Sequence, residues 1–237
     1  MTNTCMLKGN LTHPPFFDIV PASGVPFARF YIGVDLHTGM ALAVLKGNIT
    51  KQPFYNLVGP DQCPFLQFYL AVDRANQRDG RKADFLRVVA YGPRAQLDRP
   101  YLQAGSEVLV VGDLRSRDRQ VRTGTEKVVE IIAAADEGIT FLRKINYQYG
   151  DAQRAQLDLR EEADPSKHRE QGGGYFRVVA YGRLAEDVYA NLEVGAPVFV
   201  HGRLRSRQIP RKNGRGQKTV VEVVANHIVF LEGETTE

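Results

Sequence analysis

The chain contains two internal repeats, and these repeats have different offsets. Residues 7–35 align without a gap onto residues 45–73, with 14 identities in 29 positions and an offset of 38. Residues 87–117 align onto residues 177–207, with 16 identities in 31 positions and an offset of 90. Self-similarity on this scale indicates a repeated structural unit. The chain therefore carries two copies of one module.

The order of the repeated segments excludes a simple tandem duplication, which would give one constant offset. The two front segments come first and the two back segments follow, so the inner pair are 13 residues apart and the outer pair 141. We therefore expect an inner domain of residues 41–145, inserted into an outer domain of residues 1–40 plus 146–237. Loop tips tolerate such insertions because their backbone is solvated and their ends lie close together.

A second arrangement is also compatible with this order, in which the first front segment completes a module in another copy of the chain. In the nested arrangement, Gly39 and Met40 form one short junction. The other junction spans residues 146–174. There the sequence predicts a short capped helix over residues 151–163 and then a polar stretch that ends in three glycines.

Composition is that of a globular protein that remains in the compartment where it is made. Hydrophobic residues make up 43% of the 237 positions and charged residues 24%. No apolar run approaches the roughly 18 residues of a spanning helix, and the first residues do not resemble a signal peptide. Cys5 and Cys63 lack zinc-site spacing, so we expect reduced thiols. We expect a cytoplasmic, nucleoid-associated protein without a membrane partner.

Hydrophobic residues alternate with polar ones in the front segments, as Phe30, Ile32 and Val34 show. A period of two predicts half-buried strands. Each back segment reads as a strand, a short helix, a glycine and two further strands, and Pro100 predicts a shorter or kinked inner helix. The expected fold is all-β: two five-stranded Greek-key barrels of the oligonucleotide/oligosaccharide-binding (OB) type, each with one short helix. The second barrel is inserted in the loop between strands 2 and 3 of the first.

One strand of each module carries an aromatic residue, an arginine and a second aromatic residue on the same face. These two sets are Phe85, Arg87 and Tyr91, and Tyr175, Arg177 and Tyr181. Such a face offers rings for stacking on bases and a charge for phosphate. We expect no core position on this face. The alternative is that these rings cover the barrel rim or pack on the other module.

Positive charge is concentrated in two segments, although the net charge is only +4. Residues 203–218 contain seven basic side chains and no acidic one, namely Arg203, Arg205, Arg207, Arg211, Lys212, Arg215 and Lys218. The inner copy has a weaker counterpart in Arg115, Arg117, Arg119, Arg122 and Lys127. We expect phosphate-contacting hairpins, the alternative being solvated basic loops.

At the level of motifs, both modules resemble the bacterial single-stranded DNA-binding proteins of OB fold. Members open with Leu-x-Gly-x-Leu-Thr, which residues 7–12 match and residues 45–50 match with Ile49. An Arg-Val-Val strand, a Gly-x-Leu-x-[Ser/Thr]-Arg strand and a closing Glu-Val segment follow. Their counterparts are residues 87–89, 112–117 and 130–142 in the inner copy, and residues 177–179, 202–207 and 222–231 in the outer copy.

The resemblance implies that Phe85, Tyr91, Tyr175 and Tyr181 stack on bases. It also implies an assembly of four barrels, which for a two-barrel chain means a homodimer. The chain departs from the family in having no tryptophan, and Arg119 and Ile209 replace frequent aromatics. It also ends without the long acidic tail of typical members. We therefore expect greater dependence on phosphate contacts and a lesser role in recruiting other proteins, whose identity the sequence does not indicate.

The sequence does not indicate an enzyme or a cofactor. The five histidines show no metal-ligand spacing, no serine or cysteine lies in a nucleophile motif, and no carboxylates cluster for a metal. We expect sequence-tolerant binding and protection of single-stranded DNA in replication, recombination or repair. The alternative is a primosomal or mobile-element accessory protein of OB fold that acts mainly through protein contacts.

Overall fold

The structure is a computed structural model that describes residues 2–35, 37–74, 82–121, 124–134, 138–143, 174–211 and 216–231. The chain divides into two compact units. The first comprises Met1–Asn3, Ala43–Leu114 and Glu130–Gln171, and the second comprises Thr4–Leu42, Arg115–Val129 and Gly172–Glu237. The expected junction helix over residues 151–163 lies outside the described residues. No helix in the described ranges is both long enough and apolar enough to cross a membrane.

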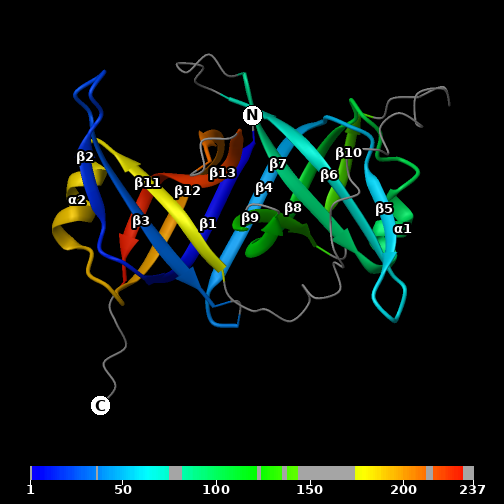
Figure 1. The fold of residues 1–237 in the computed structure, drawn as a ribbon, viewed down its shortest axis with the longest axis horizontal. Helices are drawn as coiled ribbons and strands as arrows, with labels where there is room; N and C mark the ends of the chain where they lie inside the picture. The colour runs from blue at the N-terminus through cyan, green and yellow to red at the C-terminus, as the bar shows by residue number, and fades with distance from the viewer. Residues whose placement is uncertain are drawn as a thin grey trace. The chain divides into compact units, whose positions relative to one another are not determined.

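A five-stranded barrel forms the first unit's core (Figure 1). Its elements are β4 (Met40–Ile49), β5 (Phe54–Val58), β6 (Cys63–Asp73), β7 (Ala83–Tyr91), α1 (Gly92–Asp98), β8 (Glu107–Val121), β9 (Gly124–Ala133) and β10 (Ile139–Arg143). The ring runs β4-β6-β7-β9-β8 and closes from β8 to β4, with β7 and β9 parallel. β5 extends the sheet beside β6, and β10 pairs with β8.

The second unit repeats this connectivity with strands from both ends of the chain. Its elements are β1 (Asn3–Leu11), β2 (Phe16–Ile19), β3 (Pro26–Val34), β11 (Gly174–Tyr181), α2 (Arg183–Asn191), β12 (Pro197–Pro210) and β13 (Gln217–Phe230). The ring runs β1-β3-β11-β13-β12 and closes from β12 to β1, with β11 and β13 parallel. Strands 2 and 3 of this barrel are β3 and β11, and the whole of the other barrel lies between them in sequence.

These pairings confirm the all-β fold of two five-stranded OB barrels, with one inserted between strands 2 and 3 of the other. The compact units differ from the expected domains at several places, of which the longest described one is Arg115–Val129, a segment that groups with the second unit although it lies within residues 41–145. The domain boundaries 1–40 plus 146–237 and 41–145 therefore stay a prediction, which the folding of the excised segment would test.

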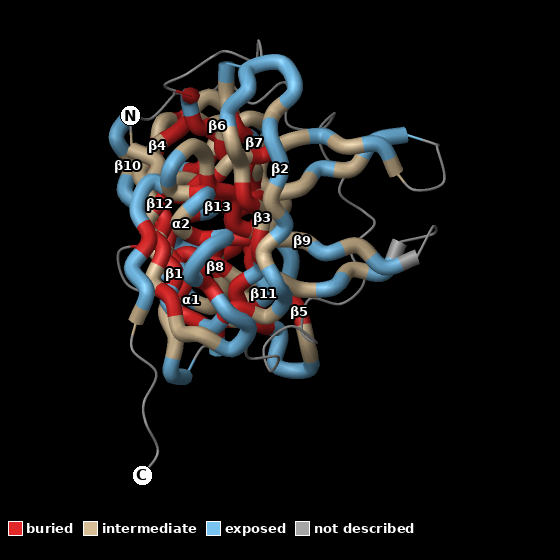
Figure 2. Tube along the Cα trace, turned by 90° about the vertical axis from the view of Figure 1, so that its left-hand side faces the viewer, coloured by how far each residue is buried: buried red, intermediate tan, exposed pale blue. Residues whose placement is uncertain are grey.

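The cores of both barrels follow from alternation along the strands. In β12, Val198, Val200 and Leu204 are fully buried, whereas Arg203, Arg205 and Arg207 occupy alternate positions that are partly exposed. Figure 2 shows such buried positions in red along the strands. Each fully buried valine or leucine side chain contributes about 1.5 to 3 kcal/mol to the free energy of folding. A shift of register by one residue would exchange the core and surface faces.

One short helix follows the third strand of each barrel, as expected. α2 has nine residues and buries Ala185 and Val188, whereas α1 has seven and ends at Asp98, two residues before Pro100. The shorter inner helix confirms the expectation from that proline. The Tyr-Gly pair at the start of each helix also has a structural reason, because Gly92 and Gly182 have φ angles of 68° and 61°, which favour glycine.

Candidate nucleic-acid interface

The outward face of the second barrel is built mainly from β3 and β11. These strands are antiparallel, with Tyr31 opposite Arg177 and Phe27 opposite Tyr181. Tyr175 has 54% of its surface exposed and Tyr31 has 37%. Arg29, also on β3, lies over the Phe16 ring of β2 at 4.5 Å. Along β11, Tyr175, Arg177 and Tyr181 lie on this face as the sequence predicted, and the buried Val179 lies between Arg177 and Tyr181 on the same face.

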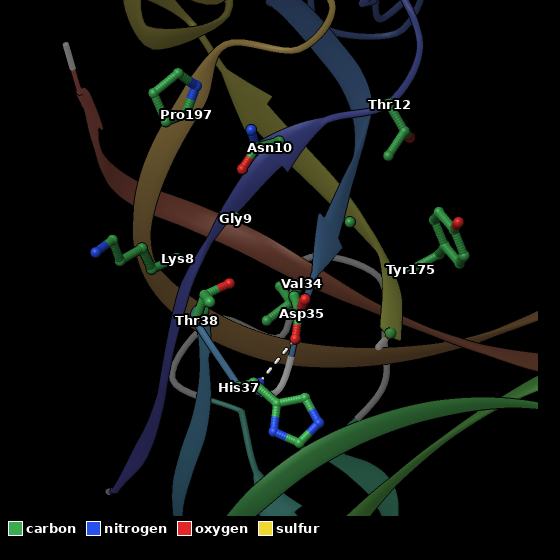
Figure 3. Close-up of a pocket in the computed structure, with 13 residues that line it drawn as sticks. Lys8, Gly9, Asn10, Thr12, Val34, Asp35, His37, Thr38, Tyr175 and Pro197 are labelled. Carbon is green, nitrogen blue, oxygen red and sulfur yellow. Dashed lines mark hydrogen bonds between the residues drawn. The ribbon is translucent and has the colours of Figure 1, made fainter. Parts of the chain in front are cut away.

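Tyr175 lies at the edge of a pocket of about 580 Å³ (Figure 3). The pocket is lined by β1, the end of β3, the turn that follows it, and Gly174. A Cβ atom on Gly33 would lie 3.6 Å from the Tyr175 ring and 3.0 Å from Thr12, so the absence of a side chain keeps room beside the ring. On the turn, the backbone N–H of His37 donates to the Asp35 carboxylate at 2.8 Å, a hydrogen bond typical of an aspartate in a turn.

The buried carboxylate of Glu222 on β13 gathers the arginines of this face. Its Oε1 accepts hydrogen bonds from Nη2 of Arg205 at 2.6 Å and from Nε at 3.0 Å. Its Oε2 lies 3.2 Å from Nε of Arg177 and 3.5 Å from Nε of Arg207. The Glu222 side chain has no exposed surface, while those of Arg177, Arg205 and Arg207 are 15%, 23% and 40% exposed. The single Glu222 carboxylate thus forms ion pairs with three guanidinium groups.

Arg205 links this ion-pair cluster to an aromatic ring. Its Nη2 donates a hydrogen bond of 2.8 Å to the hydroxyl of Tyr181, and its guanidinium carbon lies 5.6 Å from that ring. Burial acts to lower the pKa of Arg205, but the bonds to Tyr181 and Glu222 outweigh it and raise the pKa. For Arg177, burial dominates and lowers the pKa, Glu222 opposes this, and the nearby Arg207 adds to the lowering.

The two basic hairpins are only partly described. Arg203 lies half-buried on β12, and Arg211 pairs with Glu126. Lys212 and Arg215 lie outside the described residues. Their counterparts Arg115, Arg117 and Arg119 are half-buried on β8.

Glu126 also lies 3.9 Å from Arg119, and the Lys127 ammonium lies 5.2 Å from the centre of the Tyr175 ring. The Arg115–Val129 segment of the second unit therefore contacts both a predicted stacking ring and a predicted phosphate-binding arginine. These contacts lie within one compact unit.

The equivalent face of the first barrel differs from the expectation. Phe85 is 53% exposed, but Arg87 is buried and its Nε lies 3.2 Å from the Glu130 carboxylate. Tyr91 packs on Phe65 with ring centres 5.3 Å apart, in an apolar cluster that contains the fully buried Val89. The expectation that no core position lies on this face is therefore wrong for both barrels, because Val89 is fully buried and the corresponding Val179 of the second barrel is only 3% exposed. In the first barrel, the β5–β6 hairpin places apolar side chains, including those of Val58 and Phe65, on the same face.

Sequence reasoning did not identify the two glutamates that bind the arginines. Glu222 and Glu130 occupy equivalent places in the sequence, each directly after two valines in the closing strand. A charged side chain within an apolar strand, present in both copies, is the signal that could have found them, because buried carboxylates are found with partners. Tyr31 and Arg29 were also missed, although they alternate with the core residues of β3.

Comparison with known proteins identifies the family of the chain. Residues 40–141 and 150–231 match the model of the Single-strand binding protein family. The chain belongs to this family. A single-stranded DNA-binding protein from Thermotoga maritima is 38% identical over 56 residues, which are 24% of this chain and 40% of that protein. The chain thus matches less than half the length of this curated relative.

Among solved structures, a deletion mutant of the single-stranded DNA-binding protein from Thermus aquaticus aligns with 99% of this chain and 97% of its own. The TM-score is 0.45 and the sequence identity 17%. In this family member, the described residues contain no group of three or more His, Cys, Asp or Glu side chains that could hold a metal ion.

Proposed function

We propose that the chain binds single-stranded DNA without strong sequence preference and protects it during replication, recombination or repair. The observation that carries this proposal is the outward face of the second barrel, where the exposed Tyr175 ring lies on the same strand as Arg177, a member of the arginine cluster around Glu222. A π-face can stack on any base, and a guanidinium can contact any phosphate, so such a surface binds strands with little regard to sequence. Membership of the family and the name of the Thermotoga relative support this proposal.

The two barrels contribute unequally in this proposal. In the second barrel Tyr175, Arg177 and Tyr181 are at least partly exposed, whereas in the first barrel Arg87 is buried and Tyr91 packs on its own module. Phe85 is the exposed ring of the first barrel. We therefore assign the principal contact surface to Tyr175, Arg177, Tyr181 and the β12 arginines, and a secondary one to Phe85 and β8.

The proposal is tested by titrating a fluorescently labelled oligo-dT, and the matching duplex, with the purified chain at several salt concentrations. We expect tight binding to the single strand and a steep loss of affinity as salt rises, because phosphate contacts release counterions. Failure to bind below roughly micromolar concentration at moderate salt would favour the alternative accessory role through protein contacts.

We also propose that the chain acts as a homodimer that presents four barrels, in the cytoplasm at the nucleoid where single-stranded DNA arises. Support comes from the resemblance to relatives that work as four-barrel assemblies. Multi-angle light scattering at working concentration should give twice the chain mass of 26.5 kDa. A stable monomer under these conditions would contradict this part of the proposal.

A further inference from the structure

Glu222 lies at the centre of the proposed DNA-binding face without being able to touch DNA. Its carboxylate is fully buried, and three arginines from two other strands contact it within 3.5 Å. We infer that Glu222 is a positioning residue. It fixes Arg177, Arg205 and Arg207 in one arrangement and, through Arg205, orients the Tyr181 ring. This inference rests on the proposed function and adds a residue whose charge is opposite to that of its binding surface.

The first step of the argument is electrostatic. Three guanidiniums with one carboxylate leave a net charge of about +2 on the face, and mutual repulsion acts between the guanidiniums, since Arg207 lowers the pKa of Arg177. The negative charge of the buried Glu222 carboxylate offsets this repulsion between the guanidiniums. Without it, the arginines would separate and extend into solvent, as their long side chains have many accessible rotamers.

The second step concerns what remains accessible to a ligand. Exposure of the side chain rises from 0% at Glu222 through 15% at Arg177 and 23% at Arg205 to 40% at Arg207. The carboxylate is therefore covered by the cations, and an approaching phosphate meets guanidinium nitrogens first. Side chains already held in place lose less conformational entropy on binding, and this raises affinity.

The third step is the link to the aromatic ring. Nη2 of Arg205 donates both to Glu222 Oε1 and to the hydroxyl of Tyr181, so a single guanidinium connects the carboxylate to a ring proposed to stack on a base. Loss of the carboxylate would release the ring as well as the charges. The first barrel has an equivalent arginine–glutamate ion pair, because Nε of Arg87 also lies 3.2 Å from a buried glutamate, Glu130.

The decisive experiment replaces Glu222 with glutamine, which keeps the size of the side chain and removes its charge. Removing a negative charge near DNA should by itself strengthen binding. If Glu222 positions the arginines, Glu222→Gln should instead weaken binding of the full chain to labelled oligo-dT about tenfold or more, equivalent to about 1.4 kcal/mol. The matched control is Glu186→Gln, which removes the same charge from the exposed surface of α2 in the same unit. It should leave affinity unchanged or slightly increase it.

Two readouts separate positioning from a purely structural role. The salt dependence of log affinity should become less steep in Glu222→Gln by up to about 0.7 for each phosphate that the arginines no longer reach. The Nε–H signals of Arg177, Arg205 and Arg207 in a nitrogen-15 NMR spectrum should shift towards solvent-exposed values in a protein that still unfolds cooperatively. Equal or tighter DNA binding by a folded Glu222→Gln chain would overturn the inference.

A second variant covers the case in which Glu222→Gln does not fold. Glu222→Asp keeps the negative charge and withdraws the carboxylate by one methylene, so the overall electrostatics are unchanged while the geometry is altered. Positioning predicts several-fold weaker binding, and affinity equal to that of the natural chain would overturn the inference. A natural chain that binds no single strand would instead refute the proposed function, so the two failures are distinguishable.

Discussion

Replacing Tyr175 with alanine separates base stacking from fold stability better than any other substitution on the proposed surface. More than half of the Tyr175 surface is exposed, so its truncation removes little buried area. The Lys127 ammonium lies 5.2 Å from the centre of the ring, and such a cation–π pair at an exposed site contributes about 0.5 to 1 kcal/mol. We therefore expect the free energy of unfolding to fall by no more than about 1 kcal/mol.

The effect on DNA should be larger than the effect on folding. Loss of one stacked base costs about 1 to 3 kcal/mol, so affinity for oligo-dT should fall about 5- to 150-fold. Because no phosphate-binding group is removed, the dependence of log affinity on log salt should stay the same. Fluorescence anisotropy at three or more salt concentrations measures both quantities.

The comparison variant is Tyr91→Ala, which truncates another predicted stacking ring, the counterpart of Tyr181 in the first barrel. That ring packs on Phe65 within an apolar cluster, so its removal should lower the free energy of unfolding by about 2 kcal/mol. Its effect on the DNA affinity of the folded protein should be small. If Tyr175→Ala unfolds the protein, or if it leaves affinity unchanged while Tyr91→Ala reduces it, the assignment of the principal surface to the second barrel is wrong.

Three further expectations concern other parts of the chain. One variant replaces Arg211, Lys212 and Arg215 of the outer hairpin by alanine. It should weaken binding to all single strands alike, and the dependence of log affinity on log salt should become less steep by up to about 0.7 for each phosphate contact that is lost. Arg74→Ala should lower the free energy of unfolding in urea by about 3 to 5 kcal/mol, because it leaves the buried Asp84 carboxylate without the 2.6 Å ion pair. Burial raises the pKa of Cys5, so its thiol stays protonated as pH rises, and labelling by Ellman's reagent in a Cys63→Ser chain should stay slow from pH 7 to about 9; rapid labelling in the native state would contradict this.

The fold could be predicted because its signals are local or repeated. The two offsets of the repeats indicated the nesting, and the alternation at Phe30, Ile32 and Val34 indicated a strand whose alternate residues are indeed buried. The position of Pro100 indicated the shorter inner helix. Each of these follows from spacing along the chain, which the amino-acid sequence displays directly.

The candidate site could be predicted only in part, because it depends on which strands pair. Arg177, Arg205 and Glu222 come from β11, β12 and β13 and meet only when these strands are neighbours. Sequence periodicity also could not distinguish the faces of the two barrels. Arg29 lies over Phe16 in the second barrel, whereas the aligned Gln67 is buried in the first. Such differences arise from tertiary packing, which periodicity does not report.

The register between β3 and β11 has a consequence for the order of folding. Val34 pairs with Gly174, 140 positions away, whereas the equivalent pair in the first barrel, Val72 and Asp84, is only 12 positions apart. For a flexible chain, closing the longer loop costs about 2 kcal/mol more in entropy. The first barrel is therefore the faster to nucleate, and its formation shortens the loop that the second must close.

During synthesis on a ribosome, the first barrel must be completed before the second. β1 and β3 emerge first, but β11 and β12, with which they pair, are made only after all the strands of the first barrel. β1 and β3 therefore have unpaired edges while the strands of the first barrel are synthesised, and at this stage such edges can pair with other chains. Refolding from denaturant should show two phases, and the slow one should belong to the barrel that carries Tyr175.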